Sequence, residues 1–325
     1  MGIFLTIVVG AGILMAIAFF STDKRKKKTL LKENIPEDFG LLEGVPAEKL
    51  LRKMEAALPY EYVNQVKIRY LSDHPEITED EFEWRLFELK RYFILNSVMH
   101  NTPMFSSKVD EIWHEMLMFT KQYESFSEKY LGKMLHHTPN LEPEPAPQQR
   151  AFFDWVFSQL FEITEYTWQA WGDFFHYPLD AEMLKTINSL SDEQLKQRYF
   201  KVNPENQELV DYLVSQLRTQ IEEVHKIFTS DKKGNFEKPA LYGDMSGLSL
   251  MMVFYSYFYF EEYWDHAEEY AYMNQSHGTS GCSAVFCGSG GVHDSHDNGG
   301  GNNCSSSCSS SCSSSCSSCG GGCSS

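Results

Sequence analysis

The chain has 325 residues, enough for one or two domains, and aromatic side chains make up 14% of it, enough for a substantial buried core. Its net charge of −17 is concentrated in the middle of the chain, because the first 30 residues are basic and residues 274–325 are nearly uncharged. An acidic body repels phosphate groups, so the composition argues against nucleic-acid binding by the body.

An uncharged apolar stretch, GIFLTIVVGAGILMAIAFF, occupies residues 2–20, and the basic run KRKKK follows it. About 20 apolar residues cross a bilayer as a helix, and flanking basic residues stay on the cytoplasmic side. A secretory signal peptide would instead carry its basic segment before the apolar run. We therefore expect a single-pass membrane anchor at 1–22, with the N-terminus outside and the body in the cytoplasm, and a basic juxtamembrane linker at 23–46.

A first helical domain is predicted for residues 47–137. The segment from Thr78 has the pattern of a capping box, with Glu81 three residues after the capping threonine. From residue 106 onward, apolar residues step by three and four, which predicts one long amphipathic helix through residue 135. That stripe consists of Val109, Ile112, Met116, Phe119, Tyr123, Phe126 and Tyr130.

Four prolines fall between 139 and 147, so residues 138–147 are expected to form a linker. Beyond it, residues 148–273 again show helical periodicity, and alternating strand patterns are absent from the sequence. The apolar run LSLMMVFYSYFYF at 248–260 is too short to span a bilayer comfortably. It predicts a core helix, with a membrane-surface contact as the alternative. The expected fold class is all-α.

One stretch of the first region resembles the glycine-rich domain-containing protein-like family of plants and bacteria. Its Val-Asp-x-x-Trp-His element falls at 109–114, and a tyrosine, a glycine and a His-x-Pro follow, with the last of these at 137–139. The family element has a second histidine where this chain has Met116. The resemblance implies a candidate site at Asp110, Trp113, His114 and His137, and it brings no established reaction with it.

Asp110 and His114 are one helical turn apart, so the carboxylate can orient the imidazole. This pattern fits an ordinary structural histidine, and it also fits a metal site. In an unbroken helix His137 would lie more than about 30 Å from His114, so the two meet only if the helix breaks, for instance near Gly132. Trp113 lies within the apolar stripe and is expected in the core.

Two Glu-x-x-His pairs, at 111–114 and 222–225, have the spacing of di-iron bundle ligands. Their helical phase places them away from the apolar stripes, so we expect solvated faces instead. The carboxylate-rich segment EEYWDHAEE at 261–269 could hold a cation, although a solvated helix end explains it more simply.

All eight cysteines lie in a serine- and glycine-rich tail, residues 274–325, which is expected to be disordered. The final six are Cys304, Cys308, Cys312, Cys316, Cys319 and Cys323. Four interpretations stay open: a flexible tail with reduced thiols, a site for Zn²⁺ or Cu⁺, disulfide crosslinks, and a substrate for Cys/Ser modification. Disulfides are disfavoured by the expected cytoplasmic location.

Together these patterns predict a membrane-anchored helical binding or scaffold protein with a protein partner, more consistent with binding than with catalysis. The alternatives are a metal-handling protein that binds Zn²⁺ or Cu⁺ through the tail, and a substrate of Cys/Ser modification.

Overall fold

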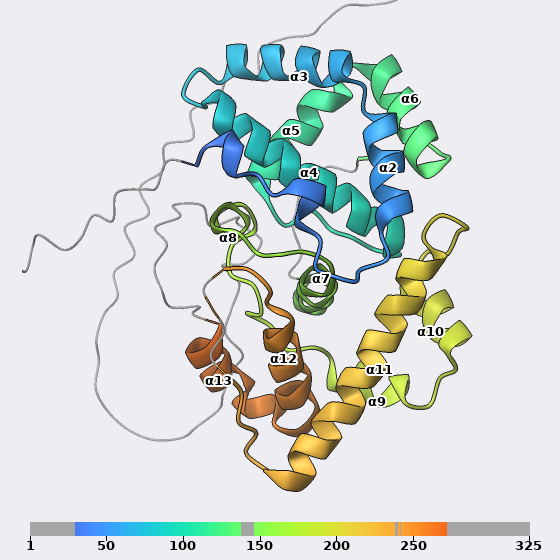
Figure 1. Cartoon of the computed structure of the whole chain (residues 1–325), viewed down its shortest axis with the longest axis vertical. Helices are drawn as coiled ribbons and strands as arrows, with labels where there is room; N and C mark the ends of the chain where they lie inside the picture. Colours follow the sequence, from blue (N-terminus) through green and yellow to red (C-terminus); the bar gives the residue numbers. More distant parts are fainter. Residues whose placement is uncertain (1–29, 138–145, 238–239, 241, 272–325) are drawn as a thin grey trace, which may run out of the picture. The chain divides into compact units, whose positions relative to one another are not determined.

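The computed structural model describes residues 30–137, 146–237, 240 and 242–271 (Figure 1). Within these ranges the regular elements are helices, accompanied by three isolated β-bridges and no strand, which confirms the all-α prediction for this part of the chain. The expected anchor at 1–22, most of the proline-rich linker and the cysteine-rich tail lie outside the described residues. Among the described helices none is long and apolar enough to cross a membrane.

The first half of the described chain is arranged around helix α4, which contacts α2, α3 and α5 (Figure 1). Side chains on all sides of α4 are buried, as expected for a helix that is covered by neighbours on every face. The elements are η1 (Lys32–Asn34), η2 (Glu37–Gly40), α2 (Glu48–Ala57), α3 (Tyr60–Asp73), α4 (Glu79–Val98), α5 (Ser107–Leu117) and α6 (Thr120–Leu131).

The predicted capping box at the start of α4 is only half formed. The Thr78 hydroxyl accepts a hydrogen bond from the backbone N–H of Glu81 at 3.1 Å, which satisfies one free amide of the first turn. The Glu81 carboxylate does not return to Thr78 but binds the Arg85 guanidinium one turn further on, at 2.8 Å. Arg85 is buried, so the carboxylate is more strongly held there than at the helix end.

The single long helix predicted over 106–135 is wrong: the chain forms α5 and α6, separated at Met118 and Phe119. In a continuous helix the carbonyl of Met116 would accept the amide of Thr120. Instead the buried Tyr62 hydroxyl of α3 donates to that carbonyl at 2.8 Å, and the amide of Phe119 reaches it at 3.2 Å. A tertiary contact therefore ends α5 although the apolar stripe continues.

Replacing Tyr62 by phenylalanine removes this hydroxyl and should lower the free energy of unfolding by about 1 kcal/mol, the usual contribution of a buried neutral hydrogen bond. Urea unfolding of the full-length protein in detergent measures the loss. Tyr60→Phe is the matched control, because the Tyr60 side chain is 76% exposed two residues earlier. An equal effect of the two substitutions would contradict the assigned role of Tyr62.

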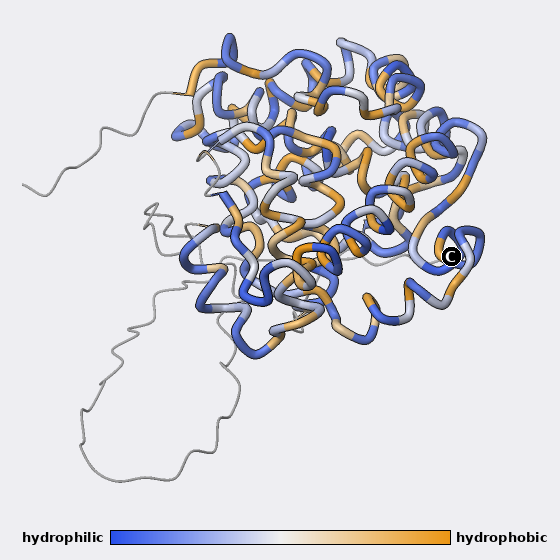
Figure 2. Tube along the Cα trace, turned by 60° about the horizontal axis from the view of Figure 1, so that its bottom comes forward, coloured by the Kyte–Doolittle hydropathy of each residue, from blue (hydrophilic) through white to orange (hydrophobic). Residues whose placement is uncertain are grey.

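The second half begins at Pro147, which occupies the first turn of α7, where its missing amide hydrogen costs nothing. Its elements are α7 (Pro147–Leu160), α8 (Glu165–Trp171), α9 (Ala181–Ile187), α10 (Asp192–Tyr199), α11 (Gln207–Ser230), α12 (Ser246–Phe258), η3 (Phe260–Glu262) and α13 (Tyr263–Tyr270). The predicted core helix at 248–260 corresponds to α12, and eight of its residues are buried. Hydrophobic stretches of the trace are most frequent in the middle of the body, and hydrophilic stretches are most frequent at its periphery (Figure 2).

Buried polar contacts join the two halves. The Glu88 carboxylate of α4 accepts hydrogen bonds from Thr167 and Trp171 of α8, at 2.7 and 2.8 Å. The described part of the segment before α2 also packs on α4, where the Trp84 indole donates to the carbonyl of Leu31. Residues 30–46 therefore form part of the packed body.

Candidate metal centre

Helix α5 places Asp110 and His114 on its outer side. The helix starts where the Ser106 hydroxyl accepts the amide of Val109 at 3.2 Å. Its apolar side, including Val109 and Trp113, is buried against the core. Asp110 and His114, one turn apart, are therefore left at the rim, with side chains 25% and 51% exposed.

The chain after α6 turns back towards α5. Helix α6 ends in Gly132, whose φ of +71° lies in the left-handed region that glycine adopts without strain. Three residues later, the carbonyl of Leu135 accepts the Tyr123 hydroxyl at 2.8 Å, and that hydroxyl also accepts the Trp113 indole N–H at 2.9 Å. These two bonds fasten the returning segment to both helices.

The returning segment brings His137 onto Asp110. The Nε2 atom of His137 lies 2.7 Å from Oδ1 of Asp110, and Nε2 of His114 lies 3.6 Å from Oδ2 of the same carboxylate. The three side chains each offer one ligand atom, and these atoms lie within 4.8 Å of one another. Residues 27 positions apart in the chain thus converge on one point.

The donor set suits a divalent transition metal. Two imidazoles and one carboxylate are the protein ligands of many three-ligand zinc sites and of non-haem Fe²⁺ sites. With metal–ligand bonds of about 2.0–2.1 Å and tetrahedral angles, neighbouring ligand atoms stand about 3.3 Å apart. A metal ion would widen the His137–Asp110 contact from 2.7 Å by about 0.6 Å, which small side-chain rotations can provide. The exposed His114 side chain is free of core packing and can follow.

Aromatic contacts hold His137 in place. Its ring lies edge-on to Trp113 at a centroid distance of 4.4 Å, and the His114 ring lies 4.5 Å away. The His137 side chain is only 7% exposed. A ligand whose ring is fixed in this way loses little conformational freedom on binding a metal, which favours affinity.

The other carboxylates of α5 are neutralised by arginines. Glu111 binds Arg85 at 2.6 Å and also accepts the Tyr70 hydroxyl, while Glu115 binds Arg69 at 3.0 Å. Glu111 is therefore committed to an ion pair, and the di-iron pattern at 111–114 does not assemble around it. Asp110 is left as the carboxylate of α5 that faces the two histidines.

The remaining sequence candidates stay apart from one another. The His225 ring packs on Tyr257 and Phe258, at 4.8 and 5.2 Å, and the His266 ring stacks on Tyr255 at 3.8 Å. Within the described ranges, Asp110, His114 and His137 are the group whose ligand atoms converge, so the carboxylates at 261–269 do not form such a group. The six tail cysteines proposed as ligands lie outside the described residues.

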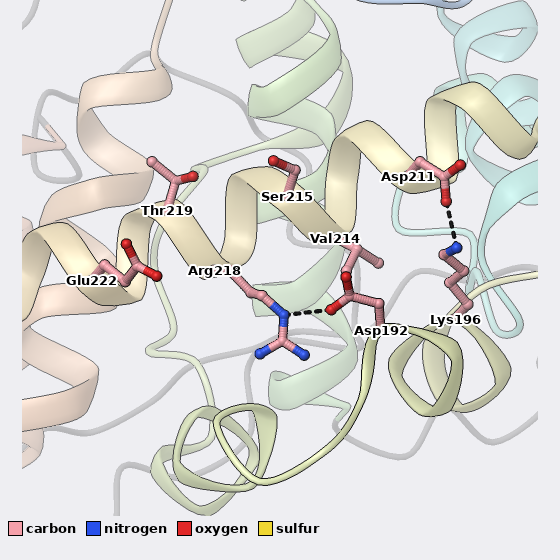
Figure 3. Close-up of a pocket in the computed structure, with 8 residues that line it drawn as sticks. All are labelled: Asp192, Lys196, Asp211, Val214, Ser215, Arg218, Thr219 and Glu222. Carbon is pink, nitrogen blue, oxygen red and sulfur yellow. Dashed lines mark hydrogen bonds and ion pairs between the residues drawn. The ribbon is translucent and has the colours of Figure 1, made fainter.

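A surface pocket lies between α10 and α11 (Figure 3). Its cations are already paired: Lys196 binds Asp211 at 2.5 Å, and Arg218 binds Asp192 at 2.6 Å. The Arg218 guanidinium also donates to the backbone carbonyls of Ile187, the last residue of α9, and of Leu190 in the connection to α10. With both of its cations paired internally, the pocket offers no converging ligand set comparable to that at Asp110.

The local pattern identified Asp110 and His114, but not how His137 reaches them. Two residues are associated with the return of the chain towards α5. Gly132 ends α6, and the hydroxyl of Tyr123 donates a hydrogen bond to the carbonyl of Leu135. The break at Met118 carries no local signal, because it depends on Tyr62 of another helix.

The described residues form an all-helical body with a candidate mononuclear metal centre, to which α5 and the segment after α6 both contribute. A family model described as UCP032817-like matches residues 52–152, from α2 into α7, and so includes all three candidate ligands. The match covers less than half of the chain, and the protein is similar to this family over that range. No curated protein and no solved structure matches the chain.

Proposed function

We propose that this protein is a membrane-anchored helical binding protein whose body holds one divalent transition-metal ion, with Zn²⁺ as the best-suited ion. The observation that carries the proposal is the convergence of Asp110, His114 and His137 within 4.8 Å. Two of these side chains come from α5 and the third from the segment after α6, so the site depends on the tertiary fold.

The charge balance supports a cation at this point. Two neutral imidazoles and one carboxylate carry a single negative charge, which a divalent ion overcompensates by one unit. The nearby Glu111 and Glu115 are already paired with arginines, so they do not compete for the ion.

The apolar stretch at 2–20 and the basic run after it support membrane attachment with the body on the cytoplasmic side. The tail cysteines are a second, independent candidate set of ligands for Zn²⁺ or Cu⁺, so the experiment must separate the two sets.

The test uses the full-length protein in detergent micelles with all eight cysteines changed to serine. Because every cysteine lies at or beyond residue 282, these changes leave the described body untouched. Isothermal titration calorimetry should show one Zn²⁺ per chain. His137→Ala should weaken binding by at least about a hundredfold, since loss of even an outer contact to a ligand costs 10–100-fold.

His136→Ala is the matched control, because this neighbouring histidine is exposed and lies outside the converging group. It should bind Zn²⁺ as the unsubstituted protein does. Absence of stoichiometric binding in the cysteine-free chain would refute the proposed centre. Binding that appears only when the cysteines are present would assign metal handling to the tail.

A further inference from the structure

The three candidate ligands leave one side of the site open to solvent. His137 is 7% exposed and lies against Trp113, whereas the His114 side chain is 51% exposed. Exposure therefore increases from the His137 side of the site to the His114 side. An ion held by all three residues would be covered on one side by protein and uncovered on the other.

Within the described ranges, no fourth histidine, cysteine, aspartate or glutamate joins this group. Structural zinc sites are usually closed by four protein ligands, whereas sites that act on external molecules have three and keep one position for water. The closest candidates on α5 are committed elsewhere: Glu111 binds Arg85 and Glu115 binds Arg69.

We propose, building on the metal site proposed above, that the ion carries an exchangeable water that a small anionic oxygen ligand, such as a carboxylate or hydroxamate, replaces. When a carboxylate binds, one metal–oxygen bond to water breaks and one to the anion forms, and no proton or electron is transferred. When a hydroxamic acid binds, it releases its proton to the buffer, and its two oxygens form bonds to the ion in place of the water. The site charge falls from +1 to 0, because the divalent ion is held by two neutral imidazoles and one carboxylate. This residual positive charge selects anions over neutral ligands.

The external ligand would bind on the His114 side of the site. The His114 side chain is the most exposed of the three candidate ligands, so it can move as the coordination changes. His137, in contrast, is held by Trp113 and Asp110. The anion therefore approaches from the outer side of α5. This geometry fits a carboxylate presented by a small molecule, which reaches the ion without opening the core.

The experiment uses the cysteine-free full-length protein loaded with Co²⁺, whose visible spectrum reports the number and type of ligands. Acetohydroxamate is titrated into this protein. We expect a saturable spectral change with one ligand per Co²⁺, while metal analysis after gel filtration shows that Co²⁺ stays bound. His136→Ala should behave in the same way. His114→Ala should alter the starting spectrum and weaken Co²⁺ binding by at least about tenfold, because one ligand is lost.

The outcomes separate the two proposals. If Co²⁺ binds one to one but its spectrum is unchanged by acetohydroxamate, the coordination sphere is closed; this inference is then wrong while the metal site stands. If acetohydroxamate strips Co²⁺ from the protein, no ternary complex exists and the inference is again wrong. If Co²⁺ and Zn²⁺ fail to bind at all, the proposed function fails and the inference falls with it.

Discussion

Glu88→Ala should lower the free energy of unfolding by about 3–5 kcal/mol, the cost of breaking a buried ion pair by removing one partner. Glu88 and Arg91 are both fully buried on α4, with Arg91 Nη1 3.4 Å from the Glu88 carboxylate. Burial lowers the pKa of the Arg91 guanidinium to about 10, so it is still charged at neutral pH. Removing the carboxylate leaves that charge without its ionic partner.

The carboxylate also satisfies two groups across the interface between the halves. Thr167 Oγ1 and Trp171 Nε1 both donate to Glu88, and both lose this acceptor in the alanine variant. Each unsatisfied buried donor adds about 1–3 kcal/mol, although the contributions of one network do not simply add.

Urea unfolding of the full-length protein in detergent measures this effect. The matched control is Glu83→Ala on the same helix, where the side chain is 27% exposed and pairs with Lys67. That pair is near the surface, so its loss should cost about 1 kcal/mol or less. A loss of less than about 1 kcal/mol for Glu88→Ala would show that the interface between α4 and α8 is not held as described.

Helix positions were predictable from the sequence where burial and local capping agree. Thr78 begins α4 as its position indicated, and α12 forms the core helix expected at 248–260. Both depend on residues close together in the chain. The reciprocal bond of the capping box failed because Arg85, a buried cation, competes for the Glu81 carboxylate.

The long helix over 106–135 shows the limit of such prediction. Its apolar stripe has no gap at Phe119, so periodicity alone favours continuity. The Tyr62 hydroxyl of α3 donates a hydrogen bond to the Met116 carbonyl, and this contact determines where the helix breaks. A side chain far away in sequence can compete for a helix carbonyl without leaving any mark on the local pattern.

The candidate site was predictable in its residues but not in its geometry. The resemblance placed Asp110, Trp113, His114 and His137 in one motif, and the break it required was expected near Gly132. The structure has two interruptions, one at Met118 and one at Gly132, and both are needed to return the chain to α5. Without the first, α6 could not lie against α5, where Tyr123 reaches Trp113.

Zn²⁺ should stabilise the cysteine-free protein against urea by about 2.7 kcal/mol at a free concentration one hundred times its dissociation constant, provided that the unfolded chain does not bind it. The ligands converge only in the folded chain, because His137 lies 27 residues from Asp110 in sequence. Tryptophan fluorescence follows unfolding with and without Zn²⁺, and the metal-dependent increment is the measured quantity.

His137→Ala should remove that increment while leaving a folded protein. Its stability without metal should fall by about 1–3 kcal/mol, since the Asp110 carboxylate loses a hydrogen-bonding partner at a partly buried position. The increment is the difference in unfolding free energy with and without Zn²⁺ for the same variant. The lower stability of the metal-free variant therefore does not affect it. His136→Ala should retain the full increment. An equal increment in all three proteins would mean that Zn²⁺ stabilises the chain elsewhere, because a three-ligand centre cannot keep its affinity when its most buried ligand is absent.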